Sequence, residues 1–376
     1  MQPTKVTISL KAIKNNVDTI RRKIGKGVKI LACVKTDAYG HGIEKVSKAI
    51  QKKVDYFGIA SIDEGAILRK IGIKLPILVL NCILPEDAKE VVNHNLSQTL
   101  CSLDIAYALD KEASKKNKKV KVHIDIDTGM GRIGISQPDT MDFIRKVSKL
   151  NNLIIEGIYT HFPSADDNGN FTHKQIKIFG QVLKKIKAIG IDIPIKHTAN
   201  SAAIMNFPKS YFNMVRPGLM LYGYYPSTNV KKTVKLKPAF SLMTKIVCLR
   251  KLPKGTTISY GRTFTTKRPS LIATLPIGYG EGYSRALSNK GEVLVQGKRV
   301  PVVGRVCMDQ LVIDVTKIPN VKTGDEVILI GGQTPHQNKF GAGQEITVEE
   351  VAELAGTIPY EIVCMVGKKT KREYKY

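Results

Sequence analysis

A single lysine stands where an apolar run of the sequence meets a glycine-containing turn. The run covers 28–34, the lysine is Lys35, and the turn at 36–42 reads TDAYGHG. An apolar run of this length predicts a buried strand. A lysine fixed at the end of such a strand loses hydration, which lowers its pKa and prepares the amine to form a Schiff base with an aldehyde. Taken alone, a lysine at this position is more often a solvated surface group.

Other residues of catalytic type also follow directly after predicted strands. They are Tyr39, Asp125 and Asp127 with the glycine-rich loop at 128–132, His161, His197, Asn200, Ser201, Arg216, Gly218 and Leu219. Each has a plainer interpretation: the loop is a tight turn, Asn200 and Ser201 begin a helix, and the histidines and the arginine are structural or surface groups. A helix that begins at Ser201 also offers N–H groups and a hydroxyl to a phosphate. Taken together, these residues predict a site for a phosphate-bearing cofactor.

The elements that must position these residues alternate between short apolar runs and helical patterns. Helices are predicted between most of the runs, at 63–71, 85–94, 103–116, 138–149 and 173–189. The predicted strands are 28–34, 54–60, 76–80, 97–101, 120–126, 153–160, 193–198 and 212–216. Eight alternations predict an α/β fold, a (β/α)8 barrel over residues 1–230, with its active site at the carboxyl ends of the strands. A doubly wound sheet is the alternative, but this sequence lacks the GxGxxG motif that is diagnostic after the first strand of such a sheet.

The pattern changes near residue 230, and 231–376 reads as a mainly-β domain. A polar, basic stretch at 226–238 with proline at both ends is typical of a linker. One helix is predicted at 347–354, where Thr347 and Glu350 have capping-box spacing. The predicted strands are 240–250, 270–277, 291–296, 299–304, 311–316 and 325–330.

Composition excludes several classes of protein. No apolar run approaches a membrane span, and the first residues lack a signal-peptide pattern, so we expect no membrane association and a cytoplasmic location. The six cysteines form no CxxC pair and the histidines no HExxH motif, which predicts reduced thiols and no metal. The net charge of +27 comes from lysine clusters without aromatic interleaving, which favours a solvated basic surface over a specific nucleic-acid site.

Eight motifs together resemble the alanine racemase family in order and spacing. They are LACVKTDAYGHG at 31–42, DTGMGRIG at 127–134, YTHF at 159–162, HTANSAA at 197–203, VRPGLMLYG at 215–223, ISYGRTF at 258–264, IGYGEGYSR at 277–285 and VGRVCMDQ at 303–310. The resemblance covers nearly the whole chain. It implies a fold-type III enzyme that depends on pyridoxal 5'-phosphate (PLP) and is a homodimer, with each active site formed by one barrel and the partner's β domain.

The same resemblance implies a role for individual residues. Lys35 is implied as the Schiff-base lysine and one acid/base group, and Tyr260 as the opposite base, reaching in from the other subunit. Further cofactor contacts are implied for Tyr39, His161, His197, Ser201, Arg216, Gly218 and Leu219, substrate contacts for Arg132 and Met308, and a position at the entrance for Tyr279. Two bases on opposite faces of a planar carbanion are what inversion of a Cα centre requires.

Two positions depart from the family pattern. Many members carry a carbamylated lysine seven residues before the arginine matched by Arg132, and this chain has Asp125 there. We expect the Asp125 carboxylate to be ionised near neutral pH and to pair with Arg132, although it could instead cap the turn after its strand. Near the C-terminus, 368–372 reads KKTKR where the family often has RVPR, and we expect Lys368 to point to solvent.

The leading hypothesis is interconversion of L-alanine and D-alanine, which supplies D-alanine for peptidoglycan. A broader amino-acid racemase, acting for example on serine, is the alternative. A non-catalytic PLP-carrier protein uses a similar barrel, but such proteins lack the β domain and the tyrosine that this chain has.

Overall fold

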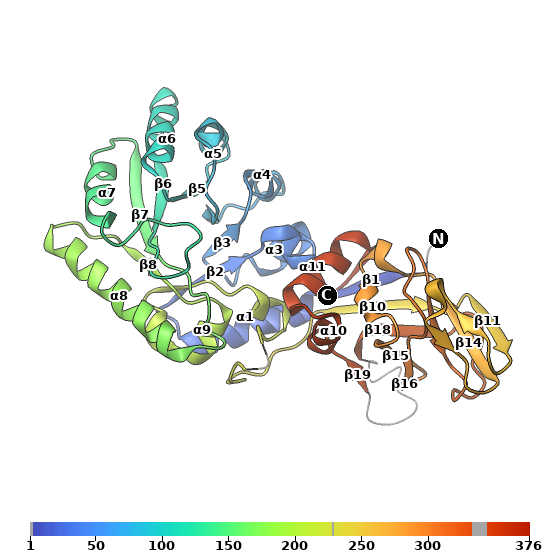
Figure 1. The fold of residues 1–376 in the computed structure, drawn as a ribbon. Helices are drawn as coiled ribbons and strands as arrows, with labels where there is room; N and C mark the ends of the chain where they lie inside the picture. The colour runs from blue at the N-terminus through green and yellow to red at the C-terminus, as the bar shows by residue number, and fades with distance from the viewer. Residues whose placement is uncertain (1–2, 228, 333–343) are drawn as a thin grey trace.

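The computed structural model describes residues 3–227, 229–332 and 344–376 of the chain. Two lobes lie side by side, a helix-ringed barrel and a strand-rich lobe, with helices α10 and α11 between them (Figure 1). One buried apolar cluster contains residues of both lobes, from Ile30 in the barrel to Val327 in the β lobe. The predicted architecture, a barrel followed by a mainly-β domain, is confirmed.

The barrel is closed by strands that are all parallel, because each apolar run is followed by a helical segment that returns the chain to the same end. The strands are β2 (Lys29–Cys33), β3 (Tyr56–Ile59), β4 (Ile77–Val79), β5 (Ser97–Leu100), β6 (Val120–Asp125), β7 (Leu153–Tyr159), β8 (Ile195–His197) and β9 (Met214–Val215). β9 pairs with β2 to close the ring. Each of the eight predicted runs contains one of these strands. Their carboxyl ends therefore converge on one mouth.

Helices cover the outside of the barrel, and their ends follow ordinary capping rules. Ser61 caps α4, for example, by accepting a hydrogen bond from the Glu64 N–H while the Glu64 carboxylate returns to the backbone. The helices are α1 (Leu10–Ile24), α3 (Ile43–Ile50), α4 (Ile62–Lys70), α5 (Ala88–Asn93), α6 (Leu103–Lys115), α7 (Thr140–Val147), α8 (Gly169–Ala188) and α9 (Ser201–Asn206). The five predicted helical stretches correspond to α4 through α8.

The described residues of the β lobe form two main sheets and one hairpin. The larger sheet has the order β16-β15-β18-β10-β1-β20, with β19 beside β18. Its strands are β1 (Lys5–Ser9), β10 (Phe240–Lys245), β15 (Glu292–Val295), β16 (Lys298–Pro301), β18 (Glu326–Gly332), β19 (Glu345–Ile346) and β20 (Arg372–Lys375). The smaller sheet joins β11 (Cys248–Leu252), β14 (Ser270–Leu275) and β17 (Leu311–Asp314), and β12 (Thr257–Ile258) pairs with β13 (Phe264–Thr265).

Two features of this lobe differ from the sequence expectation. β1, at the start of the chain, pairs with β10 and β20 and so belongs to the sheet of the C-terminal lobe. The single strand predicted at 240–250 is two strands in two sheets. The chain changes sheet at Ile246 and Val247, whose N–H groups bond to Asp325 and Thr274 on different neighbours. The linker expected at 226–238 contains no helix or strand among its described residues, and Thr228 within it lies outside them.

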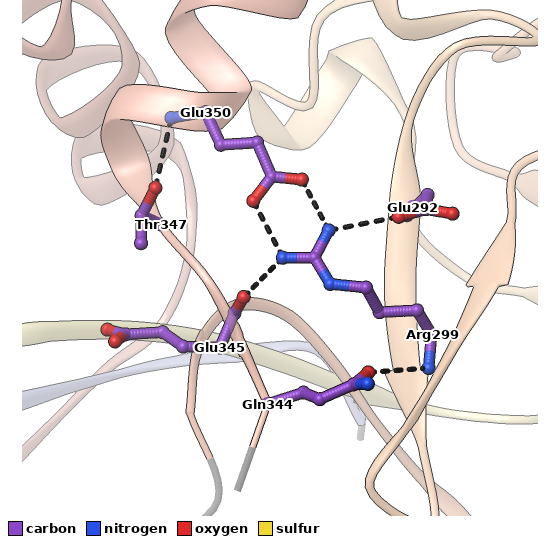
Figure 2. A network of polar contacts seen from close by, with 6 residues as sticks. All are labelled: Glu292, Arg299, Gln344, Glu345, Thr347 and Glu350. Atoms are coloured by element: carbon purple, nitrogen blue, oxygen red, sulfur yellow. Dashed lines mark hydrogen bonds and ion pairs between the residues drawn. The ribbon is translucent and has the colours of Figure 1, made fainter.

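Helix α10 (Val348–Ala355) is anchored to the β lobe by a polar network around Arg299 (Figure 2). The guanidinium contacts both Glu350 carboxylate oxygens at 2.5 and 2.8 Å and Glu292 at 2.9 Å. As predicted, Thr347 caps the helix, accepting from the Glu350 N–H at 3.0 Å. A second helix, α11 (Pro359–Lys369), packs against α10, whereas the sequence predicted one helix here. The network thus fixes a helix pair that reaches the barrel.

The cysteine expectation is wrong at one pair, because Cys82 and Cys101 form a disulfide in the structure. The two residues follow the neighbouring strands β4 and β5, which places their Cα atoms 6.5 Å apart, within the range that a disulfide spans. A sequence separation of 19 residues gives no sign of this contact. No helix within the described part of the chain is long and apolar enough to cross a membrane.

Candidate active site

A cavity of about 470 Å³ opens at the carboxyl ends of the barrel strands. The candidate residues from the sequence that line it include Lys35, Tyr39, Asp125, Arg132, His161, Asn200, Ser201, Arg216 and Gly218. Because they follow strands β2, β6, β7, β8 and β9, only closure of the barrel brings them together. A cavity of this size, with apolar walls and converging polar groups, is typical of a cofactor or substrate site.

Lys35 begins a tight turn of unusual backbone geometry, α2 (Lys35–Tyr39). The four residues from Thr36 to Tyr39 all have φ of 53–54°, in the left-handed region. Each left-handed residue other than glycine costs about 1–2 kcal/mol, so such runs persist only where their surroundings hold them. The turn has a clear result, since it places both Lys35 and Tyr39 on the cavity wall.

A small cradle forms where Tyr39, Ser201 and Gly218 meet. A Cβ atom on Gly218 would lie 2.5 Å from the Tyr39 hydroxyl, so a larger residue would force the Tyr39 ring to move. The Ser201 Oγ accepts hydrogen bonds from the N–H groups of Gly218 and Met220, at 3.0 and 3.3 Å. Ser201 and Ala202 also begin α9, where N–H groups have no partner within the helix. Leu219 beside them is fully buried and does not line the cavity.

Arg216 is the centre of the buried hydrogen bonding behind the cavity. One guanidinium nitrogen, Nη1, donates to His197 Nδ1 and to the His197 carbonyl, both at 2.9 Å. The other, Nη2, donates to the Thr160 carbonyl at 2.8 Å and reaches His161 Nδ1 at 3.3 Å. Burial lowers the pKa of Arg216 from its very high ordinary value. These partners fix the plane of the guanidinium at the cavity wall.

A chain of hydrogen bonds continues from Arg216 through the barrel interior. His197 Nε2 lies 2.9 Å from His123 Nδ1, and His123 Nε2 lies 3.3 Å from the carboxylate of Glu156. Because a guanidinium only donates and a carboxylate only accepts, both imidazoles must be neutral with the proton on Nε2. Burial lowers the pKa of both His197 and His123, in agreement with this assignment. His197 therefore lies behind Arg216, outside the cavity, and holds it in place.

The series of hydrogen bonds that begins at Arg216 ends at an ionised carboxylate, that of Glu156. Burial raises the pKa of Glu156, but hydrogen bonds from His123 and Lys121 outweigh it and bring the pKa to about 2. His161, by contrast, has its pKa lowered to about 3 by burial and by the nearby charge of Arg216. The imidazole that lines the cavity is thus neutral at physiological pH.

Asp125 departs from the expectation that it is ionised near neutral pH. Burial raises its pKa to about 7, although the charges of Arg216 and Arg132 act in the opposite direction. Asp125 and Arg132 line the same cavity, and no ion pair within 4.0 Å joins them in the described part of the chain. The turn after β6 is capped by Asp127 instead, whose carboxylate accepts from the N–H groups of Gly129 and Met130 at 2.8 Å.

Three predicted residues lie in the β lobe, away from this cavity. Tyr260 is 71% exposed, Met308 55% and Tyr279 38%, and none of them lines it. They are close to one another: the Tyr279 N–H bonds to the Cys307 carbonyl, and Ser259 bonds to the Arg305 carbonyl. The structure thus gathers one group of predicted residues in the barrel mouth and a second on an open surface.

Helix α11 adds residues that the sequence analysis missed. Tyr360 and Cys364 line the cavity, and the Tyr360 ring lies 6.0 Å from that of Tyr39. A proline at the first helical position, Pro359, was a usable signal for this helix. Lys368, near its end, is exposed and does not line the cavity, as expected.

A closed parallel barrel with a lysine in its mouth, joined to a β lobe, defines a two-lobed barrel enzyme. Comparison with known proteins makes the class specific. Two family models match the chain: the N-terminal domain of alanine racemase over residues 8–226, and its C-terminal domain over 239–374.

Full-length relatives agree with these matches. The chain is 45% identical over 376 residues to the alanine racemase of Halothermothrix orenii, covering 100% of this chain and 97% of that one. Its structure superposes on alanine racemase from Clostridium difficile 630 with a TM-score of 0.92 at 38% identity, over 100% of this chain and 96% of the other. Alanine racemase from Bartonella henselae, solved with covalently bound pyridoxal phosphate, gives a TM-score of 0.88 at 29% identity, over 100% of both chains.

The chain therefore belongs to the alanine racemase family. It is an isomerase acting on amino acids.

Proposed function

We propose that the protein interconverts L-alanine and D-alanine with PLP held in the barrel mouth, through two bases, Lys35 and Tyr260. The observation that carries the proposal is the shared cavity, which is lined by Lys35 and by the cradle of Tyr39, Ser201 and Gly218. The family and its relatives support alanine as the substrate. The product D-alanine would serve peptidoglycan synthesis, and a cytoplasmic location stays a prediction.

The residues present fit PLP. Gly218 leaves the space that a Cβ would fill, and the start of α9 offers the N–H groups that bind a phosphate. Lys35 would bond the cofactor aldehyde, and Arg216 would face its ring nitrogen. When bound, PLP supplies the delocalisation that stabilises negative charge at Cα.

Arg216 would control how strongly that charge is withdrawn. A guanidinium is already charged and gives up no proton, so the ring nitrogen it faces would stay unprotonated. In the series from Arg216 through His197 and His123 to Glu156, each group donates to the next. This fixed direction would keep Arg216 charged and the ring nitrogen that it faces unprotonated. The expected result is racemisation with little transamination.

The substrate would be held by Arg132, whose guanidinium lines the cavity and suits a carboxylate. Lys35 would move a proton on one face of Cα. Tyr260 would act on the other face, and its exposure in this chain supports delivery to the barrel of a second copy. Met308 and Tyr279, on the same open surface, would complete the pocket from that copy. The active species would then be a homodimer with two shared sites.

A racemisation assay over a panel of amino acids tests the proposal. The purified protein with added PLP should develop an absorbance band at about 420 nm. Borohydride should abolish this band by reducing the Schiff base between PLP and Lys35. L-alanine and D-alanine should be interconverted faster than the serine enantiomers. Equal rates for alanine and serine would favour the broader racemase, and a band without turnover would leave only PLP binding.

A further inference from the structure

The turn that carries Lys35 and Tyr39 is contacted by the end of the chain. Helix α11 packs against α2, and β20 follows directly after that helix. β20 is held in its sheet by parallel pairing with β1. The last residues of the protein, although distant in sequence, thus lie against the turn at 36–42.

Asp37 is the polar centre of the contact. One carboxylate oxygen accepts from the Ile43 N–H at 2.7 Å, which ties the middle of the turn to the start of α3. The other oxygen forms an ion pair with Arg372 of β20. The same Arg372 nitrogen donates to the Gly40 carbonyl at 3.3 Å. From the barrel side, Glu64 accepts from the Asp37 N–H at 3.2 Å.

The backbone of the turn at 36–42 also touches the backbone of α11, with no side chain between them. A Cβ on Gly40 would collide with the Val363 carbonyl, and a Cβ on Gly367 would collide with the Gly40 carbonyl. A Cβ on Gly42 would collide with the Tyr374 hydroxyl. Such contacts leave the turn little room to relax.

We propose that Arg372 is a positioning residue for the reaction: its ion pair with Asp37 keeps the turn at 36–42 left-handed and so holds Lys35 and Tyr39 in the cavity. The importance of Lys35 and Tyr39 rests on the proposed function. The ion pair between Arg372 and Asp37, called the clamp below, is formed by residues of this chain alone.

The physical reason is the backbone strain in the turn. Four consecutive left-handed residues other than glycine have no intrinsic preference for that conformation, and three of them, Thr36, Asp37 and Ala38, also have ψ of 48–51°. Local hydrogen bonds, such as that from the Gly40 N–H to the Thr36 carbonyl at 3.0 Å, exist only once the turn has formed. An external charge that engages both Asp37 and Gly40 favours the formed turn over relaxed alternatives.

Hydrogen exchange of the full chain, with and without added PLP, tests the clamp directly. Arg372→Met should raise exchange of the amides at 36–43 by about tenfold or more, while the barrel strands exchange as in the native protein. The matched control is Glu373→Gln, which removes the ion pair of the adjacent residue with Lys5 (2.9 Å) from the same strand without touching the turn. Arg372→Lys keeps the charge and should restore part of the protection.

The outcomes separate the possibilities. Faster exchange in Arg372→Met but not in Glu373→Gln supports the clamp. Equal loosening in both variants, or in neither, overturns it. If Arg372→Met does not fold, Asp37→Asn removes the same ion pair while keeping an acceptor for Ile43, and must give the same local loosening. Failure of the proposed function would appear separately, as native protein that is protected in the turn yet does not racemise alanine.

A kinetic readout then connects the clamp to the reaction. Arg372→Met should bind PLP about tenfold more weakly and lose kcat with an unchanged KM for alanine, because it affects Lys35 and not the substrate contacts. A change in KM with native kcat and native PLP affinity would contradict the positioning role.

Discussion

The barrel mouth and the open surface of the β lobe carry the two halves of one predicted site, and they are built differently. Around Arg216, side chains are buried and linked to one another as far as Glu156. Tyr260 instead lies in the short turn that connects β12 to β13, and Ile258 of β12 belongs to a small separate core with Ile272 and Val303. The barrel half links the groups around Arg216 through buried hydrogen bonds, whereas the β half presents a tyrosine to solvent.

The contrast shows that a proposed base can lie on a defined turn and still have no cavity beside it in its own chain. Ser259, Gly261 and Arg262 around Tyr260 all have positive φ, and the tyrosine on this turn is exposed. An exposed tyrosine held this way is suited to enter a concave surface. The barrel mouth is such a surface, which is why the proposed dimer pairs each half with its counterpart on another copy.

The strongest test of this pairing is complementation between two inactive variants. Lys35→Ala removes the amine and Tyr260→Ala the opposite base, so each homodimer should be inactive. After subunit exchange, half of the dimers carry one intact site, and about a quarter of native activity should return. Racemisation of the mixture, measured beside a subunit-exchange assay, gives the answer. Exchange without recovery would contradict a site shared between subunits.

Tyr260→Phe is expected to have the next largest effect, on one direction of proton transfer. Loss of a positioned acid/base group slows its step by about 10²–10⁴-fold. The variant should still bind PLP, because the residues proposed to hold the cofactor, such as Lys35, Ser201 and Gly218, all lie in the barrel and are unchanged. Deuterium incorporation from solvent, started from each enantiomer, should become unequal. Equal labelling from both enantiomers would reject the two-base assignment.

The barrel half was largely predictable because its signals are local. An apolar run followed by Lys35, Asp125 or Arg216 marks a strand end, and strand ends of a parallel barrel share one mouth. The capping of α10 by Thr347 was likewise visible in the sequence.

The parts that could not be predicted depend on contacts between distant segments. The pairing of Cys82 with Cys101, the place of β1 in the C-terminal sheet and the approach of Tyr360 to Tyr39 all arise from packing. The raised pKa of Asp125 is of the same kind, because desolvation is known only once the surroundings are built. Sequence separation hides each of these contacts.

Asp125→Asn should change KM moderately and in a pH-dependent way. The folded pKa of about 7 lies above the ordinary value of 3.8, so ionisation of Asp125 opposes folding increasingly between pH 4 and pH 7. The asparagine variant lacks this cost, and its stability relative to the native protein should rise over that interval. Its KM for alanine should exceed the native value by a few-fold at pH 8, where native Asp125 is charged near Arg132, and by less at pH 6.

The control for this effect is Asp127→Ala. It removes the cap of the turn that leads to Arg132 and should lower thermal stability, and any change in KM should be the same at pH 6 and pH 8. Native activity should be indifferent to added bicarbonate, because Asp125 needs no carbon dioxide to carry its charge. A KM ratio that is constant from pH 6 to pH 8 would show that ionised Asp125 does not assist the substrate site.

The smallest effect is expected at the ion-pair network of the β lobe (Figure 2). Glu350→Gln weakens the two-pronged contact with Arg299, whose side chains are about one third exposed, at 29% and 30%. Partly exposed ion pairs contribute about 1 kcal/mol or less, so Tm should fall by about 1 °C in a chain of this size. Because the site residues are untouched, kcat and KM should remain native. A large loss of kcat would instead mean that the anchoring of α10 is transmitted through α11 to Tyr360 in the cavity.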